Sequence, residues 1–177
     1  MTKVLRILSA MFLLTFSGLA EDGPAGAAGT PGCGVTNVKF DVKTAKDQHQ
    51  PLPNANKALV YIIEDDSDFG SIPKPTTRIG ADGNWLGATH GNSYFSFFVD
   101  PGVHHLCVNW QSAVLLAKGR QTAALHFKAQ SGGTYYFQIK NTYWLDHGRA
   151  GMSLNPLDSD QGQLLADKFP LSIPHEK

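Results

Sequence analysis

Apolar and polar side chains alternate along most of the chain after residue 34. Every second residue is apolar through most of Val35–Lys43, in Thr122–Lys128 and in Thr134–Lys140. A period of two places successive side chains on opposite faces of a strand. These segments are therefore predicted to be strands that bury one face.

Turn signals separate further strands. Lys57–Ile63 is apolar on both faces, which indicates a covered central strand. Asp82-Gly83 predicts a two-residue hairpin, because both residues tolerate positive φ. The remaining strands are expected at Thr76–Ala81, at Asn84–Ala88, within Phe95–Trp110 and around Ala150–Leu154. About seven or eight strands with turns between them predict an all-β sandwich or barrel, in a single domain over residues 35–177.

One segment near the C-terminus is predicted to be a short helix. It covers Ser159–Lys168, and Pro170 would stop it. Gly162 weakens this helix. Leu165 and Phe169 are four residues apart and could dock it on the sandwich.

The stretch Phe95–Trp110 is predicted to form a hairpin centred on Pro101-Gly102. The pairs expected on its core face are Val99–His104, Phe97–Leu106 and Phe95–Val108. Those expected on its other, mixed face are Phe98–His105, Ser96–Cys107 and Tyr94–Asn109. Tyr94, Phe98, His105 and Asn109 are therefore the candidate ligand-facing surface, for a saccharide or a peptide.

The N-terminus has the three parts of an export signal. Lys3 and Arg6 precede an apolar run, and small residues end at Ala20. The run is too short to span a membrane. Residues 1–20 are therefore predicted to be a cleaved signal peptide, residues 21–34, rich in Gly, Ala and Pro, a flexible tether, and the mature protein periplasmic or secreted.

Charge argues against nucleic acid as a partner. Loss of Lys3 and Arg6 with the leader would leave a formal charge of −2, and the remaining basic residues are scattered. No transmembrane span is expected after the leader is removed.

Cys33 and Cys107 are the two cysteines of the chain. An even number of cysteines in an exported protein favours a disulfide. A Cys33–Cys107 bridge would hold the N-terminal segment across the mixed face of the predicted hairpin. Two free thiols, or pairing with a partner chain, are the alternatives.

Metal binding by the neighbouring histidines is not expected. Adjacent residues of a strand point to opposite faces, so His104 and His105 cannot bind one ion together. His90 could approach His104 at the end of the sheet. The acidic run Glu64–Asp68 lacks the spacing of a calcium loop and is predicted to be a solvated loop.

No catalytic motif stands out. The sequence has no Gly-x-Ser-x-Gly, His-Glu-x-x-His, phosphate-loop or dinucleotide pattern. The aromatic residues that could build a stacking platform, although aromatics in β-domains are more often core, are Trp85, Tyr94, Phe98, Trp110, Tyr136, Tyr143 and Trp144.

Three segments, KALVYII, GNSYFSFFVDPGVHHL and SGGTYYF, together with the Asp82-Gly83 hairpin, resemble in order and spacing a bacterial family called domain of unknown function 2846. The resemblance covers about Lys57 to Ile139. It implies an exported or lipid-anchored β-sandwich of prealbumin/Ig-like outline, and it implies no catalytic residue. The chain lacks the lipid-anchor cysteine, so surface attachment does not follow.

These observations favour a non-catalytic, exported module with a binding or envelope-associated role and no cofactor. One alternative is a metal-dependent or hydrolytic envelope enzyme that uses His90, His104 and the acidic run. The other is a structural subunit.

Overall fold

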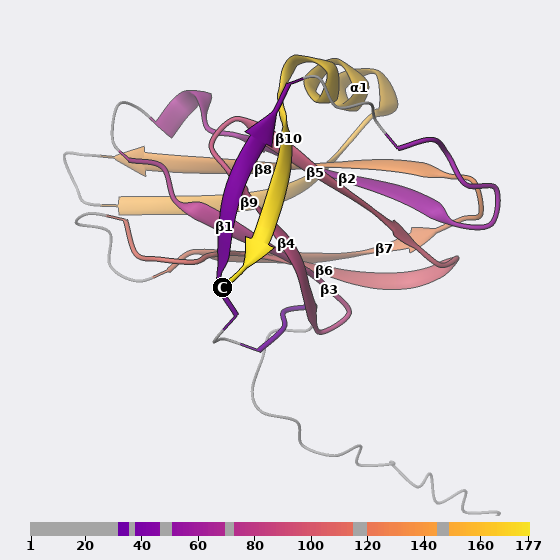
Figure 1. Ribbon diagram of the computed structural model, residues 1–177, viewed down its shortest axis with the longest axis horizontal. Helices are drawn as coiled ribbons and strands as arrows, with labels where there is room; N and C mark the ends of the chain where they lie inside the picture. Colours follow the sequence, from indigo (N-terminus) through magenta and orange to yellow (C-terminus); the bar gives the residue numbers. More distant parts are fainter. Residues whose placement is uncertain (1–31, 36–37, 47–50, 70–72, 115–119, 145–148) are drawn as a thin grey trace, which may run out of the picture.

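The part of the chain that the structure describes folds into two facing β-sheets and one α-helix (Figure 1). The computed structural model describes residues 32–35, 38–46, 51–69, 73–114, 120–144 and 149–177. The larger sheet has the strand order β1-β10-β5-β2-β8-β9, and the smaller one β4-β3-β6-β7. The strands are β1 (Phe40–Ala45), β2 (Ala58–Asp65), β3 (Thr76–Ala81), β4 (Asn84–His90), β5 (Ser93–Val99), β6 (Gly102–Trp110), β7 (Thr122–Ala129), β8 (Thr134–Trp144), β9 (Arg149–Leu157) and β10 (Leu171–Glu176). An all-β sandwich is confirmed, with ten strands in the described residues.

The core lies between the two sheets. Val60 and Ile62 of β2 have no exposed surface and pack with Ile79 of β3 and Ile139 of β8. Burial of such side chains contributes about 1.5–3 kcal/mol each. β2 is buried along both faces, as its continuous apolar run predicts, because the helix covers its outer side.

The predicted hairpin within Phe95–Trp110 is wrong. β5 pairs with β2, whereas β6 pairs with β3 and β7. Pro101-Gly102 therefore connects the two sheets instead of two neighbouring strands. The core face is as predicted for Phe95, Phe97, Val99, Leu106 and Val108, which meet across the sandwich. Alternation decides which face of a strand is buried, but it does not identify the partner strand.

The turn between β3 and β4 is the predicted hairpin. Asp82 has φ 51° and Gly83 has φ 82°, and Ala81 pairs with Asn84. Positive φ at both central residues defines a type I′ turn.

The helix α1 (Ser159–Lys168) spans the predicted residues and lies on the outer face of the larger sheet (Figure 1). Leu165 and Phe169 are buried there, as expected. Gly162 is needed at this contact, because a Cβ at its position would lie 2.1 Å from Cγ of Tyr136. The Asp158 carboxylate caps the helix by accepting a hydrogen bond from the N–H of Gln161.

Strand β10 was not predicted; Pro170 lies directly before it and Pro174 lies within it. It meets β5 in parallel at one position, Leu171 opposite Tyr94, and then pairs with the whole of β1. Figure 1 shows β1 and β10 running steeply across the other strands of the larger sheet. The two strands therefore separate from β5 and close one side of the sandwich against β4.

The Cys33–Cys107 disulfide is confirmed, with the two Cα atoms 5.1 Å apart. It holds the N-terminal segment across the outer face of the smaller sheet, where Cys107 is fully buried. The indole N–H of Trp85 donates to the carbonyl of Val35 in this segment. β1 begins at Phe40, later than the predicted Val35–Lys43.

The predicted leader and most of the predicted tether lie outside the described residues. Among those that are described, no helix is long and apolar enough to cross a bilayer.

Candidate functional site

The four residues of the predicted ligand-facing surface lie on two different sheets. Tyr94 and Phe98 belong to β5 of the larger sheet, and His105 and Asn109 belong to β6 of the smaller one. Tyr94 is buried with the helix and Asn109 binds Arg78, whereas Phe98 and His105 are exposed. The four do not form one surface, because the predicted β5–β6 pairing that joined them is wrong.

His90 and His104 also lie apart. His90 pairs with Thr76 at the start of β3, whereas His104 binds Asp82 just beyond its end. The length of β3 separates them by roughly 20 Å. Within the described ranges, no group of three or more His, Cys, Asp or Glu side chains could hold a metal ion.

His104 instead joins the β3–β4 turn to the connection between β5 and β6. Its Nδ1 lies 2.6 Å from Oδ2 of Asp82, and its Nε2 lies 2.7 Å from the carbonyl oxygen of Asp100. Both partners are acceptors, so both ring nitrogens donate, as in the protonated form. Partial burial lowers the pKa of His104, but the two hydrogen bonds outweigh it and raise the pKa above its ordinary value.

A cleft of about 440 Å³ opens where β10 leaves β5. Its walls are mainly apolar and include Pro51, Phe95, Leu171, Ile173 and Pro174, with Ser96 among them. A Cβ at Gly87 would lie 2.7 Å from the ring of Phe95 and 2.9 Å from the ring of Pro174. The glycine therefore lets these two rings approach each other over β4.

The β5 backbone directs polar groups toward this cleft. The N–H of Tyr94 donates to the carbonyl of Pro170, so the backbone of Tyr94 faces the β10 side. Alternate residues of a strand direct their N–H and C=O groups to the same edge. Ser96 and Phe98 therefore present theirs to that side, where β10 has already diverged and the described residues supply no strand partner.

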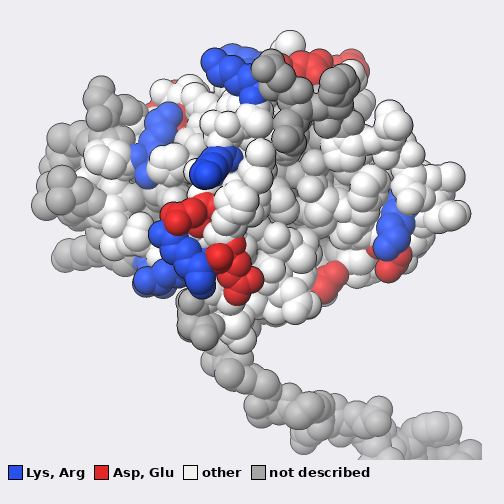
Figure 2. Space-filling model, viewed as in Figure 1, with Lys and Arg blue, Asp and Glu red and all other residues white. Residues whose placement is uncertain are grey.

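The surface around the cleft is poor in charge. Figure 2 shows few charged side chains between β10 and the right-hand ends of β5 and β2. Leu52, next to Pro51 of the cleft wall, is 86% exposed, and Phe98 is 38% exposed. This surface suits an uncharged, partly apolar ligand.

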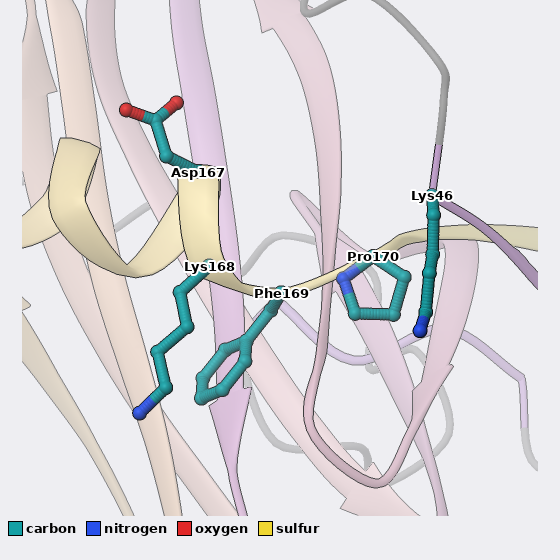
Figure 3. Close-up of a pocket in the computed structure, with 5 residues that line it drawn as sticks. All are labelled: Lys46, Asp167, Lys168, Phe169 and Pro170. Atoms are coloured by element: carbon teal, nitrogen blue, oxygen red, sulfur yellow. The ribbon is translucent and has the colours of Figure 1, made fainter.

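A smaller cavity of about 220 Å³ lies between the end of β1 and the end of α1 (Figure 3). Figure 3 shows Lys46 beside Pro170, with Lys168 and Phe169 pointing to the same side and Asp167 pointing away. Among the described residues, the lining is Lys46, the helix end and Pro170, and the polar groups of this lining do not converge.

Three tyrosines lie beneath the helix. The ring of Tyr61 is 4.9 Å from that of Tyr136 and 5.8 Å from that of Tyr94. Burial, the two neighbouring phenols and Asp167 raise the pKa of Tyr61 to about 12. The phenol of Tyr61 therefore stays protonated near neutral pH, and this aromatic group serves as packing.

The acidic run, predicted to be a solvated loop, contains the most deeply buried charges of the described residues. Glu64 is 0% exposed and Asp66 is 1% exposed. The amide Nδ2 of Asn141 donates to Oε1 of Glu64 at 2.7 Å and to Oδ1 of Asp66 at 2.8 Å. The hydroxyl of Thr77 donates to the same Glu64 oxygen at 2.5 Å.

Strand parity explains why these groups meet. Glu64, Trp110 and Asn141 each follow a core residue of their strand by two positions, and Thr77 precedes one by two. The four therefore form a polar layer at one end of the core. The carbonyl oxygen of the Asn141 side chain accepts from the indole N–H of Trp110 at 2.9 Å, which orients the amide. The solvated-loop prediction is wrong for Glu64 and Asp66, because the alternation of β2 extends through Glu64.

Burial dominates the electrostatics of this layer. It raises the pKa of Glu64 to about 8, with a further rise from Asp66 and an opposing effect of the hydrogen bonds from Thr77 and Asn141. Burial likewise raises the pKa of Asp66, against the hydrogen bond from Asn141 and the charge of Lys74.

Comparisons with protein-family models, with curated proteins and with solved structures found no match to this chain.

Proposed function

We propose that this protein is an exported, non-catalytic β-sandwich module that binds an extended polypeptide segment by strand addition to β5. The observation that carries this proposal is the cleft between β5 and β10, where backbone groups of Ser96 and Phe98 have no strand partner in the described residues. A strand added to an open edge gains main-chain hydrogen bonds, and neighbouring pockets accept its alternate side chains.

A peptide fits this cleft better than a saccharide does. Saccharide recognition would use exposed aromatic faces, and several predicted platform residues are occupied. Tyr94 and Trp110 are buried. The ring of Tyr136 stacks on that of Tyr61, and the guanidinium of Arg78 lies over the ring of Trp85. The side chain of Trp144 lies outside the described residues.

Export to the periplasm or beyond is part of the proposal. The predicted leader at residues 1–20 supports it, and the disulfide fits an oxidising compartment. We further propose a prealbumin/Ig-like sandwich related to domain of unknown function 2846, on the strength of the quoted sequence segments. Cell fractionation of the full chain, with a cytoplasmic marker as control, tests the location.

Strand addition is tested by replacing the edge N–H. Ser96→Pro removes one donor from the open edge of β5 and leaves the hydrogen bonds to β2 in place. Ser96→Ala keeps the donor and is the matched control. An array of uncharged, partly apolar peptides is screened for binding. In backbone NMR spectra, a bound peptide should shift the amide resonances of Ser96 and Phe98. The Ser96→Pro variant should bind that peptide about tenfold more weakly.

Two outcomes contradict the proposal. One is equal affinity of Ser96→Pro and Ser96→Ala for every bound peptide, and the other is a set of shifts confined to surfaces away from β5. Turnover of an envelope substrate that a single polar substitution abolishes would favour the enzyme alternative. The separation of His90 from His104 leaves that alternative without a shared site.

A further inference from the structure

Glu64 and Asp66 are two buried carboxyl groups with only one shared donor between them. Asn141 holds one oxygen of each, and its two hydrogen bonds place those oxygens within about 5.5 Å of each other. The other oxygens, Oε2 of Glu64 and Oδ2 of Asp66, are buried and have no hydrogen-bond partner. Among the described residues, neither carboxyl forms an ion pair within 4.0 Å.

Two negative charges this close cannot both persist without water or a cation. A proton on one of these oxygens removes one charge and turns that oxygen from an acceptor into a donor. We infer that Glu64 and Asp66 hold a single proton between them in the folded protein, and that its loss at alkaline pH loosens the adjoining corner, Asp66–Phe69.

The corner is coupled to the pair through three contacts. The carbonyl of Asp66 accepts from the N–H of Phe69 at 3.0 Å, in the short helix η1 (Ser67–Phe69). The ring of Phe69 meets that of Trp110 edge-on, with centroids 5.9 Å apart. Trp110 donates to Asn141, which holds both carboxyls. Repulsion between two carboxylates would therefore disturb Asn141, the Trp110 indole and the packing of Phe69 together.

The surrounding charges define how the pair titrates. Lys74 and His90 favour the ionised form of Asp66, and Asp65 opposes it. Asp68 of η1 is paired with Lys140 at 2.8 Å. The polar groups that β3, β4 and β8 direct at Glu64 are Thr77, Thr89 and Asn141, none of which is charged.

The test compares pH dependence in matched variants. Glu64→Gln keeps the shape of the side chain and its acceptor oxygen, and adds a permanent donor in place of the proton. Glu176→Gln, at an exposed position of β10, is the control. Thermal unfolding is measured between about pH 6 and about pH 10, a range that brackets titration of the pair.

The wild-type and control Tm values should fall over this range by at least about 5 °C more than that of Glu64→Gln. The indole N–H resonance of Trp110 should move with pH in the wild type and stay constant in Glu64→Gln. Equal pH slopes for all three proteins would overturn the inference.

A second measurement does not depend on the variant. Infrared spectra of the wild-type protein should contain the band of a buried, protonated carboxyl group at about pH 6, and it should disappear at about pH 10. Absence of that band at the lower pH would also refute the shared proton. The same holds if Ca²⁺ or Mg²⁺ at neutral pH raises Tm and removes the pH dependence, because a cation would then neutralise the pair.

Discussion

The contact between Gly162 and Tyr136 leads to a prediction opposite in sign to that from helix propensity. Alanine is favoured over glycine in a helix by about 1 kcal/mol, so Gly162→Ala would stabilise a solvent-exposed turn. Gly162 is buried against β8, however, and the new Cβ would lie 2.1 Å from Cγ and 2.4 Å from Cβ of Tyr136. We expect Gly162→Ala to destabilise the protein.

The magnitude follows from what can move. Cβ of Tyr136 is fixed by the backbone of β8, so rotation of the side chain about χ1 can move Cγ and the ring but leaves the 2.4 Å contact with Cβ in place. The helix would have to shift by about 1.5 Å to restore an ordinary contact. That shift loosens Leu165 and Phe169, which are 6% and 9% exposed. Overpacking of this kind costs about 3 kcal/mol, which leaves a net loss of about 2 kcal/mol after the gain in propensity.

Thermal or urea unfolding of the purified protein measures this loss. A decrease of about 2 kcal/mol lowers Tm by about 4–8 °C for a chain of this size. Gly162→Ser, with one more atom, should lose more. Gln163→Ala changes the neighbouring exposed position and should stay within about 0.5 kcal/mol of the wild type. A Tm for Gly162→Ala equal to or above that of the wild type would show that the helix is not seated on Tyr136 and would refute the reasoning.

Two further predictions concern the disulfide and His104. Thiol titration of the denatured, unreduced protein should find no free cysteine. The Cys33→Ser/Cys107→Ser double variant should lose about 4 kcal/mol and expose the segment before Val35 to proteolysis; two free thiols in the wild type would contradict this. The raised pKa of His104 means that its stabilising effect is complete below its ordinary pKa of about 6.5 and is lost as pH rises through the higher folded value. His104→Asn should therefore cost about 1 kcal/mol at the acidic end and little at the alkaline end, and a loss that is constant with pH would argue against a protonated imidazole.

The faces of individual strands could be predicted from the sequence, because burial of alternate residues is a local property. Phe95 and Phe97 are in the core as the alternation of β5 requires, and Asp82-Gly83 forms its hairpin because only two residues decide that turn. The disulfide was also within reach, since the chain has two cysteines and a leader that predicts export.

Strand pairing could not be predicted from the local pattern of apolar and polar residues. A Pro-Gly pair between two apolar strands fits a hairpin and a crossing between sheets equally well. The chain crosses between the sheets at Pro101-Gly102 because β5 pairs with β2 of the larger sheet and β6 pairs with β3 of the smaller one. The predicted β5–β6 pairing, which had joined Tyr94, Phe98, His105 and Asn109 in one candidate surface, was wrong for this reason. The cleft beside β5 depends on β10, which comes about 75 residues later in the chain.

Periodicity along the chain thus decides which side chains avoid water, since it needs nothing beyond near neighbours in sequence. The environment of a charge is different. The local sequence predicts that Glu64 and Asp66 are solvated. In the structure they are buried by a layer that includes Thr77, Trp110 and Asn141 of three other strands. Long-range packing alone sets the exposure of those carboxyls, because the cost of burying a charge depends on every group that surrounds it.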